Sequence, residues 1–344
     1  MPYPESNHSQ DHLPAVLVTG GAGYIGSHIC KVLAASGYRP VVYDNLINGH
    51  RWAVRWGAFE HGDILDRARL DEVIAKYRPR NIIHCAAYAY VRESIAHPGK
   101  YYLNNVAGTL NLLRAAQQHE IRNVIYSSSC AVFGTPASVP IDEDAPKAPI
   151  NPYGMTKLTV ENMLRDFQQA HGLNWISLRF FNAAGCDPDG EIGEFHDPET
   201  HIIPRALAAA TGTGESLAIF GTDYDTADGS CIRDYVHVSD LAAAHVLAMK
   251  ALENSLRSGE FNLGTGKGYS VLEVIETVRQ VTGRAIPFTI GRRSAGDPAA
   301  LVSNPDRARS VLGWTPAIPE LRDIVRTAWE WHRSARRQNI ADLV

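Results

Sequence analysis

The chain of 344 residues has no long hydrophobic run and no strong charge of one sign. No stretch of about 18 apolar residues occurs, so we expect no transmembrane helix. The polar opening lacks the apolar core of a signal peptide, and we expect residues 1–13 to form a flexible extension. The net charge of −4 gives little attraction for nucleic acid or an anionic membrane, which favours a small-molecule partner.

The cysteines also lack the spacing that would indicate disulfides or a metal site. Five cysteines are present, an odd number, widely spaced and without a Cys-x-x-Cys pair. Such scattered cysteines are typical of reduced thiols, so we expect a cytoplasmic protein. Hydrophobic residues make up 45% of the chain, which is enough for one large core or two packed domains.

What the sequence does contain is a glycine-rich turn between an apolar run and a helical pattern. Residues 15–19 predict a strand, and Gly20, Gly23 and Gly26 follow it. At this spacing the glycines let the backbone turn tightly, let a pyrophosphate approach it, and let the next helix pack on the strand. The start of that helix offers unpaired N–H groups to an anion. The turn therefore predicts a dinucleotide site.

The end of the second predicted strand indicates which dinucleotide binds. Asp44 follows an apolar run over 40–43 and lies 18 residues after Gly26. A carboxylate there can accept hydrogen bonds from both ribose hydroxyls, whereas an NADP site needs a cation for the 2′-phosphate. Asp44 can also act only as a turn former. At this distance from the glycine turn, it predicts NAD.

Strand and helix patterns then alternate along the first half of the chain. Strands are expected at 58–60, 82–87 and 124–126, and helices at 66–76 and 99–119. This alternation predicts an α/β fold with a Rossmann doubly wound parallel sheet. Ligands of such sheets lie at the carboxyl ends of the strands, where Gly20, Asp44, Asp63, Ala86 and Ser129 all fall.

Tyr153 and Lys157 form a Tyr-x-x-x-Lys pair at the start of another predicted helix. Asn151 suits the N-cap and Pro152 the first helical position, so the pair lies one turn apart on one face. Proton abstraction near neutral pH needs the tyrosine pKa to fall by roughly three units, to which Lys157 and an oxidised nicotinamide could both contribute. Ser129 can donate a hydrogen bond to the substrate oxygen. The pair alone is more often a solvated helix face, but with Ser129 and the dinucleotide turn it predicts a catalytic set.

Composition changes after residue 185, where Gly, Asp, Pro and Thr become frequent. We expect an NAD-binding domain over 14–185 plus 231–263, and a smaller mixed α/β C-terminal substrate lobe over 186–230 plus 264–344. The lobe opens with His196, Asp197, Glu199 and His201, which could be mistaken for metal ligands. Because they lie in a proline-broken loop rather than at a fixed helix spacing, we expect them to shape the loop and we expect no metal.

A second feature of the lobe is a pair of arginines beside glycine. Arg292 and Arg293 suit bidentate phosphate binding, and a solvated loop is the alternative.

Together these motifs resemble the extended short-chain dehydrogenase/reductase family, and within it the UDP-glucose (UDP-galactose) 4-epimerases. The likeness runs from about residue 16 to 331. It rests on the glycine turn over 20–28, Tyr-Asp-Asn-Leu at 43–46, Gly-Asp-Ile at 62–64, three serines at 127–129, Asn-Pro-Tyr-Gly at 151–154, Arg-Phe-Phe-Asn at 179–182 and Arg-Asp-Tyr-Val-His-Val at 233–238.

The resemblance implies a resident NAD, a UDP-sugar substrate and a homodimer. The cofactor-binding residues would be Gly20, Gly23, Tyr24, Ile25, Gly26, Asp44, Asn45, Leu46, Asn48, Gly49, Asp63, Ile64, Cys85, Ala86, Ala87, Asn104, Ser127, Tyr153, Lys157 and Phe181. The substrate-binding residues would be Ser129, Tyr153, Asn182, His201, Ile202, Ala218, Ile219, Phe220, Arg233, one of Arg292 and Arg293 (Arg293 is our choice), Asp297 and Leu301.

The activity that the resemblance implies is the interconversion of UDP-glucose and UDP-galactose. Tyr153 would remove the proton of the sugar 4′-hydroxyl while C4 gives its hydride to NAD. The bound 4-ketose would turn about its pyrophosphate link, and hydride and proton would return on the opposite face. The configuration at C4 is then inverted with no net oxidation.

The chain departs from the pattern of these epimerases at a few positions. Ala89 stands where many carry a lysine near the nicotinamide ribose, Cys130-Ala131 where Ala-Thr is usual, and Phe133 where Tyr is common. Leu301, at the position that limits the C2 substituent, has intermediate bulk and leaves acceptance of N-acetylated sugars open.

Other functions share parts of this pattern. A UDP-pentose (xylose/arabinose) 4-epimerase and a UDP-GlcNAc 4-epimerase remain alternatives. A nucleotide-sugar 4,6-dehydratase needs an acid and a base beside the serine, which Cys130-Ala131 does not supply. A non-catalytic NAD-binding protein would have no need of Ser129, Tyr153 and Lys157.

Overall fold

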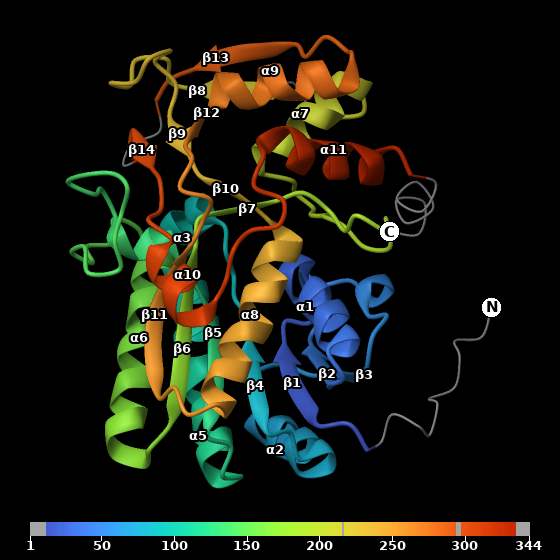
Figure 1. The fold of residues 1–344 in the computed structure, drawn as a ribbon, viewed down its shortest axis with the longest axis vertical. Coiled ribbons are helices and arrows are strands. Elements are labelled where there is room, and N and C mark those ends of the chain that lie inside the picture. The colour runs from blue at the N-terminus through green and yellow to red at the C-terminus, as the bar shows by residue number, and fades with distance from the viewer. Residues whose placement is uncertain (1–11, 215–216, 294–296, 335–344) are drawn as a thin grey trace.

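The computed structural model, which describes residues 12–214, 217–293 and 297–334, is organised around a seven-stranded sheet (Figure 1). The strand order is β3-β2-β1-β4-β5-β6-β11 and all neighbours are parallel. This is the predicted doubly wound arrangement. The strands are β1 (Ala15–Thr19), β2 (Arg39–Asp44), β3 (Ala58–His61), β4 (Asn81–His84), β5 (Asn123–Ser129), β6 (Asn174–Phe180) and β11 (Ser258–Leu263).

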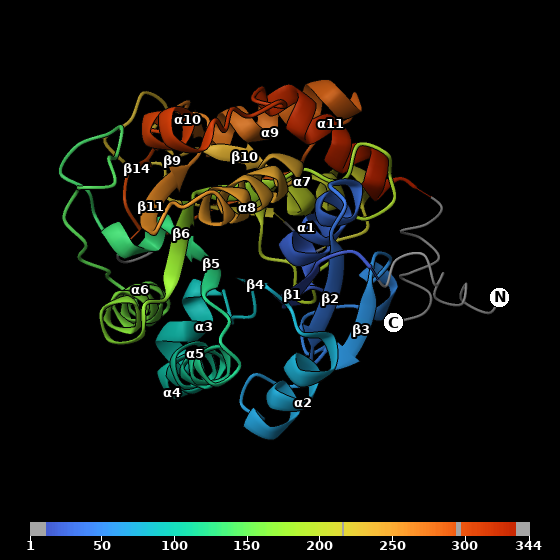
Figure 2. The same cartoon turned by 60° about the horizontal axis from the view of Figure 1, so that its bottom comes forward.

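Helices cover both faces of the sheet (Figure 2). One face carries α1 (Tyr24–Ala35) and α8 (Val238–Glu253), and the other carries α2 (Arg67–Tyr77), α5 (Thr109–Gln118) and α6 (Pro152–His171). Each face has its own apolar core, because alternate residues of a buried strand point to opposite sides. Val16 and Val18 pack on the first side, and Leu17 on the second.

A smaller mixed lobe lies over the carboxyl ends of these strands (Figure 1). Its helices α7, α9 and α11 share a third apolar core with β8. The elements of this part of the chain are β7 (Asn182–Ala184), α7 (Ile202–Thr211), β8 (Leu217–Phe220), β9 (Ile232–Arg233), β10 (Tyr235–His237), β12 (Tyr269–Ser270), α9 (Val271–Thr282), β13 (Phe288–Gly291), β14 (Ala300–Leu301), α10 (Asp306–Leu312) and α11 (Leu321–His332).

Short helical segments complete the described chain. They are η2 (Arg51–Ala53), α3 (Val91–Ala96), α4 (Pro98–Tyr101), η3 (Tyr102–Gly108) and η4 (Cys130–Phe133). The α/β fold class and the mixed lobe are thus confirmed, whereas the domain boundaries stay a prediction. Within the described residues, none of the helices combines the length and apolarity needed to cross a membrane.

The structure corrects some predicted elements. The helix expected at 99–119 is split by the π-helical segment η3, and α3 and α7 were not predicted. The apolar pattern of residues 233–238 also predicts a strand, but this strand is broken at Asp234. The buried Asp234 carboxylate accepts hydrogen bonds from Thr265, Gly266 and Ser303, which belong to two other segments. Residues 1–11 of the expected extension and 335–344 of the expected lobe lie outside the described residues.

Candidate active site

A cavity of about 750 Å³ lies where the carboxyl ends of the sheet strands meet the lobe. This volume is in the range of small-molecule sites. Every residue chosen above for cofactor or substrate lines it except Leu46, Asp63 and Arg293, and the alternative Arg292 does not line it either. The tertiary structure thus brings together residues that are spread over nearly 300 positions of the chain, from Gly20 to Leu301.

The glycine turn leaves one side of its backbone open to this cavity. Gly20 has a φ of +72°, and a Cβ on it would lie 2.6 Å from Ala86 N. A Cβ on Gly26 would lie 2.2 Å from Gly20 O, so only glycine lets α1 start this close to β1. Among the described residues, no side chain caps α1 and its first turn has no acidic residue. The turn therefore fits an anion at the helix N-terminus.

Asp44 ends β2 beside this turn and is almost fully buried. Its Oδ2 accepts the Ala22 N–H at 3.0 Å and its Oδ1 the Leu46 N–H at 2.8 Å. These bonds hold the carboxylate in one orientation, and each oxygen keeps a further lone pair for a hydroxyl donor. The position fits a ribose, as an NAD site requires.

The three predicted residues that do not line the cavity have other partners. Asp63 accepts hydrogen bonds from Asn45 Nδ2 and from the Leu65 N–H, both at 2.8 Å. Leu46 donates its N–H to Asp44 and packs against the core beside α1. The Arg293 guanidinium lies over the Tyr224 ring, 3.8 Å from its centroid. Their roles as contact residues stay predictions, and the structure places none of them on the cavity wall.

Ser129, Tyr153 and Lys157 converge at the ends of β5 and α6. Asn151 Oδ1 accepts the Gly154 N–H at 2.8 Å, so it caps α6 as predicted and starts the helix at Pro152. The three side chains line the cavity and are nearly buried. Lys157 Nζ donates to Ser127 O at 2.7 Å, and it lies 5.7 Å from the centroid of the Tyr153 ring.

Burial determines the electrostatics of this group. It raises the pKa of Tyr153 to about 12, although a hydrogen bond with Ser129 works in the opposite direction and lowers this pKa. It lowers the pKa of Lys157 to about 8. The expected depression of the tyrosine pKa is therefore not built into the protein alone, because desolvation disfavours a phenolate without a nearby positive charge.

A buried ion pair beneath the site holds α6 on the sheet. Arg179 Nη2 lies 2.7 Å from Glu161 Oε2, and both side chains are fully buried. Glu161 Oε1 also accepts bonds from Ser128 and Ser177 at 2.7 and 2.8 Å. One residue of α6 is thus bonded to both β5 and β6, four residues after Lys157. The sequence motif contained Arg179, but it gave no indication of its partner.

The lobe contributes the opposite wall. Arg233, on β9, is nearly buried and pairs with Asp297 across the cavity edge. Its Nη1 also donates to Ile232 O at 2.7 Å. Asn182, His201 and Phe220 line the same space.

Several wall residues were not predicted from the sequence. They include Tyr88, Tyr90, Arg92, His196 and Arg205. Arg92 belongs to the unpredicted helix α3, and its guanidinium lies 4.1 Å from the centroid of the Phe220 ring. Arg92 and Arg205 belong to helices that no motif indicated, and only the packing of α3 and α7 brings them to the cavity.

Comparisons with known proteins agree with this geometry. The NAD dependent epimerase/dehydratase family model matches residues 16–264. A UDP-glucose 4-epimerase of Rhizobium meliloti is 54% identical over 325 residues, covering 94% of this chain and 98% of that protein. The crystal structure of UDP-glucose 4-epimerase from Brucella ovis in complex with NAD has a TM-score of 0.90 at 53% identity, covering 93% of this chain and 98% of that one.

A third similar protein was solved with a nucleotide sugar. It is a UDP-glucose-4-epimerase from Stenotrophomonas maltophila with bound NAD and formylated UDP-arabinopyranose, with a TM-score of 0.90, 37% identity and coverage of 95% of this chain and 100% of that one. With the family model and these near full-length matches, the chain belongs to the NAD dependent epimerase/dehydratase family.

Proposed function

We propose that this protein is a UDP-glucose 4-epimerase, an isomerase that interconverts UDP-glucose and UDP-galactose through a bound 4-keto sugar with NAD as its resident cofactor. The observation that carries the proposal is that Ser129, Tyr153 and Lys157 share one cavity with the glycine turn and Asp44. The similar UDP-glucose 4-epimerases, two of them described with NAD, support the same activity.

The chain offers binding groups for both ends of an NAD molecule. The turn at Gly20, Gly23 and Gly26 would hold the pyrophosphate, and Asp44 the adenosine ribose. Tyr153 and Lys157, at the other end of the cavity, would flank the nicotinamide. Bound NAD supplies reversible acceptance of a hydride from C4 of the sugar.

Tyr153 takes the proton of the 4′-hydroxyl and later returns it. Its raised pKa means that the side chain needs added positive charge before it can act as a base near neutral pH. Lys157 is mostly protonated at pH 7, since its pKa is about 8, but its charge is already present in the protein in which the Tyr153 pKa is raised. The positive ring of the oxidised cofactor would supply the added charge. Ser129 hydrogen-bonds the same substrate oxygen and orients it.

The lobe binds the UDP part of the substrate. Arg233 offers its guanidinium to the pyrophosphate from a buried position, where charge-assisted hydrogen bonds are strong. The sugar, held less firmly than the diphosphate, would be able to turn within the cavity. Firm binding at the diphosphate and loose binding at the sugar suit a reaction in which both faces of C4 must meet the same cofactor.

The identity of the sugar is the least determined part of the proposal. We place a hexose first, and a UDP-pentose or UDP-GlcNAc remains the alternative. The Stenotrophomonas maltophila relative carries a UDP-arabinopyranose derivative, and Leu301, which lines this cavity, is a residue of intermediate size.

A homodimer in the cytoplasm also belongs to this proposal. Tyr102, Leu103, Leu110 and Met155 are large apolar side chains on η3, α5 and α6 that stay 39–57% exposed, and exposed apolar residues on packed helices suit a subunit interface. All five cysteines are free thiols, which suits a reducing compartment.

A substrate panel tests the proposed function. The purified protein is incubated with UDP-Gal, UDP-GlcNAc, UDP-Xyl and UDP-Ara in separate reactions, and the products are resolved by NMR. We expect 4-epimerisation without added NAD, fastest with UDP-Gal, and release of NAD or NADH from the acid-denatured protein. Faster conversion of a pentose or an N-acetylhexosamine would move the assignment to that sugar. Absence of conversion in all four reactions would overturn it.

A further inference from the structure

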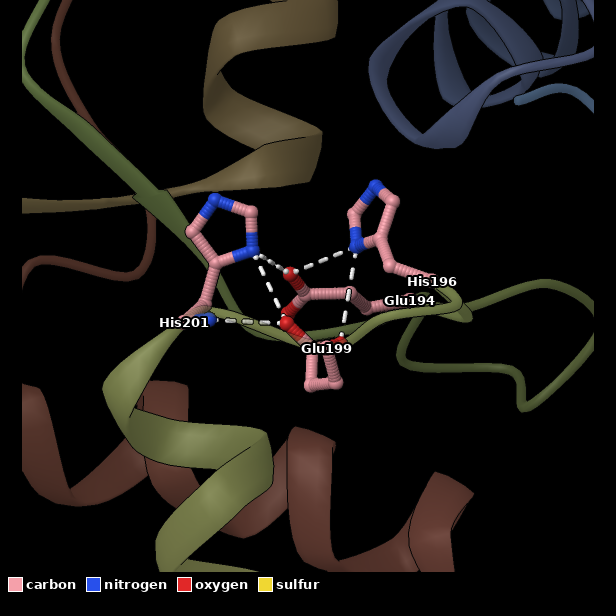
Figure 3. A group of neighbouring side chains, drawn as sticks. All are labelled: Glu194, His196, Glu199 and His201. Atoms are coloured by element: carbon pink, nitrogen blue, oxygen red, sulfur yellow. Dashed lines mark hydrogen bonds and ion pairs between the residues drawn. The ribbon is translucent and has the colours of Figure 1, made fainter. Parts of the chain in front are cut away.

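Four side chains of the loop before α7 meet beside the cavity (Figure 3), and two of them, His196 and His201, line it. They are Glu194, His196, Glu199 and His201, and each offers a ligand atom within 4.8 Å of the other three. The sequence predicted that this segment only shapes a loop. The folded chain instead turns both imidazoles toward both carboxylates, adding Glu194 to the group and leaving Asp197 out of it.

The distances between these atoms match the edges of a small metal polyhedron. His201 Nδ1 lies 2.7 Å from Glu194 Oε1 and 3.1 Å from Glu199 Oε1. His196 Nδ1 lies 3.3 Å from Glu194 Oε1 and 3.5 Å from Glu199 Oε2. A tetrahedral ion with bonds of about 2.0–2.1 Å has ligand-to-ligand edges of roughly 3.3 Å. The four distances lie within about 0.6 Å of that value. Because they involve both oxygens of Glu199, this carboxylate would bind through one oxygen or both.

Hydrogen bonding does not account for all of these atoms. Within the described residues, Glu194 Oε1 and His196 Nδ1 are buried and neither has a hydrogen bond of acceptable geometry. The Glu194 side chain is only 5% exposed. A buried carboxylate oxygen without a directed donor is costly. A cation between the four side chains would satisfy it.

The charges of the group favour a divalent ion. With neutral imidazoles the four side chains carry two negative charges, which a divalent cation balances. Two protons are the competing cations: burial works to lower the pKa of His196, but the Glu194 and Glu199 carboxylates raise it to about 9. A cluster that binds a divalent ion and a cluster that holds two protons differ in their affinity for added metal, so a metal titration distinguishes them.

We propose that Glu194, His196, Glu199 and His201 form a binding site for a divalent transition-metal ion, with Zn²⁺ as the best match. Imidazole nitrogens favour Zn²⁺ and its neighbours over Ca²⁺ and Mg²⁺, which prefer oxygen ligands alone. Four protein ligands are typical of a structural site rather than a catalytic one. The His201 side chain, 46% exposed, borders the cavity and leaves an entry path.

The position of the site suggests what the ion would do. His201 is the N-cap residue of α7, and the His196 ring lies 6.0 Å from the ring of Tyr24, at the start of α1. Binding would therefore fasten the loop to the start of α7 where the lobe faces the glycine turn. The proposed metal site does not depend on the proposed epimerase activity.

A second acidic group in the chain provides a matched control. Asp187, Asp189 and Glu191 also lie close together, but Lys31 Nζ is 2.8, 2.6 and 3.0 Å from their carboxylates. Here the chain supplies its own cation, and only oxygen ligands are present. We expect no tight Zn²⁺ binding at this group.

Metal titration of the chelator-treated full chain tests the proposal. Zn²⁺ alone is added, and bound metal is measured by mass spectrometry and calorimetry. Co²⁺ in its place reports geometry through its visible spectrum. We expect one ion per chain with micromolar or tighter affinity, a tetrahedral Co²⁺ spectrum and a higher melting temperature.

The variants Glu194→Gln and His196→Asn identify the ligands, and Asp189→Asn is the control. Because disturbing even an outer partner of a metal ligand weakens binding 10- to 100-fold, loss of a ligand should weaken it at least about 100-fold, while the control keeps full affinity. Circular dichroism and the content of co-purified NAD show whether each variant is folded. Failure of the folded wild-type chain to bind Zn²⁺ at micromolar concentration, or equal binding by the folded variants, would overturn the proposal and leave a proton-filled ion-pair cluster.

Discussion

The two walls of the cavity are built in different ways. The sheet wall takes Ser129 from the seven-residue strand β5 and Tyr153 and Lys157 from the 20-residue helix α6. The lobe wall takes Arg233 and Leu301 from the two-residue strands β9 and β14. Long elements with a buried face resist local distortion, whereas very short strands depend on their neighbours. The proposed function thus places the chemistry on the longer elements and the substrate binding on the shorter ones.

Each wall has a buried carboxylate whose hydrogen bonds connect the elements of that wall. Glu161 ties α6 to β5 and β6 under the catalytic set. Asp234 does the equivalent in the lobe, where its carboxylate accepts five hydrogen bonds from Thr265, Gly266 and Ser303. Glu161 joins a helix to two neighbouring strands of the large sheet, while Asp234 joins the residues that precede β12 and follow β14, the two strands that pair with β9. The comparison implies that mutations in the sheet wall change kcat and mutations in the lobe wall change KM.

The largest effect is expected from Tyr153→Phe. Removing the hydroxyl that is proposed to carry the proton should lower kcat at least about 1,000-fold, within the range of general acid–base catalysis, while NAD still co-purifies. Steady-state turnover of UDP-Gal and the NAD content measure the two effects. Tyr88→Phe, on the same cavity, is the control and should keep most activity. Similar losses in both variants would contradict the proton-transfer role.

Lys157→Met should lower kcat by about 100-fold or more, because the phenolate loses a buried positive neighbour. The wild type should also lose kcat above pH 8, since its lysine has a pKa of about 8 and becomes neutral as the pH rises through that value. The methionine variant carries no such charge at any pH and should lack this decline. A pH profile from 6 to 10 compares the two, and parallel profiles would argue against the role of the lysine charge.

Gly26→Ala tests the turn at the foot of the sheet wall. A Cβ there would lie 2.2 Å from Gly20 O, a backbone clash that must move the turn. Overpacking of this kind costs about 1–3 kcal/mol, or up to about 100-fold in NAD affinity. NAD retained through gel filtration measures the loss. Gly99→Ala meets no atom within 4 Å and should retain the wild-type content; normal retention in both would remove the turn from the NAD site.

The smallest effect is expected on the lobe wall. Arg233→Met should raise KM for UDP-Gal about 10- to 30-fold through loss of a charge-assisted hydrogen bond, and kcat should stay within about threefold of the wild type. Asp297→Asn, which removes the carboxylate paired with Arg233, should change KM less. A matching fall in kcat for Arg233→Met would break the division between the two walls.

Much of the sheet wall could be predicted because its signals are local. The apolar run before Gly20, the N-cap at Asn151 and the one-turn spacing of Tyr153 and Lys157 each act within a few residues. Asp44 was placed correctly at a strand end for the same reason. Its hydrogen bonds from Ala22 and Leu46 could not be read from the sequence, because they depend on how β2 meets the turn.

The lobe was less predictable because the contacts that stabilise it join residues far apart in the sequence. Arg293 looked like a phosphate ligand beside Gly291, yet its guanidinium lies over Tyr224. Helix α7 lies in a segment that looked like an irregular loop, and its core partners on α9 and α11 come some 70 to 120 residues later. A short helix of this kind is stabilised mainly by such packing and not by its own propensity.

The sequence by itself determined the α/β class, the glycine turn at a strand end and the one-turn spacing of Tyr153 and Lys157, since each depends on periodicity or on spacing within one or two elements. The resemblance to 4-epimerases came instead from several short motifs spread from residue 20 to residue 238. Only the tertiary structure decided which acid lies beneath α6, where the strand at 233–238 breaks, and that Glu194 joins His196, Glu199 and His201. Each of these features is a contact between segments that are far apart in the sequence, or between side chains that a loop turns toward one another. Side-chain direction in a loop follows from the packing around it, and local sequence patterns carry no record of that packing.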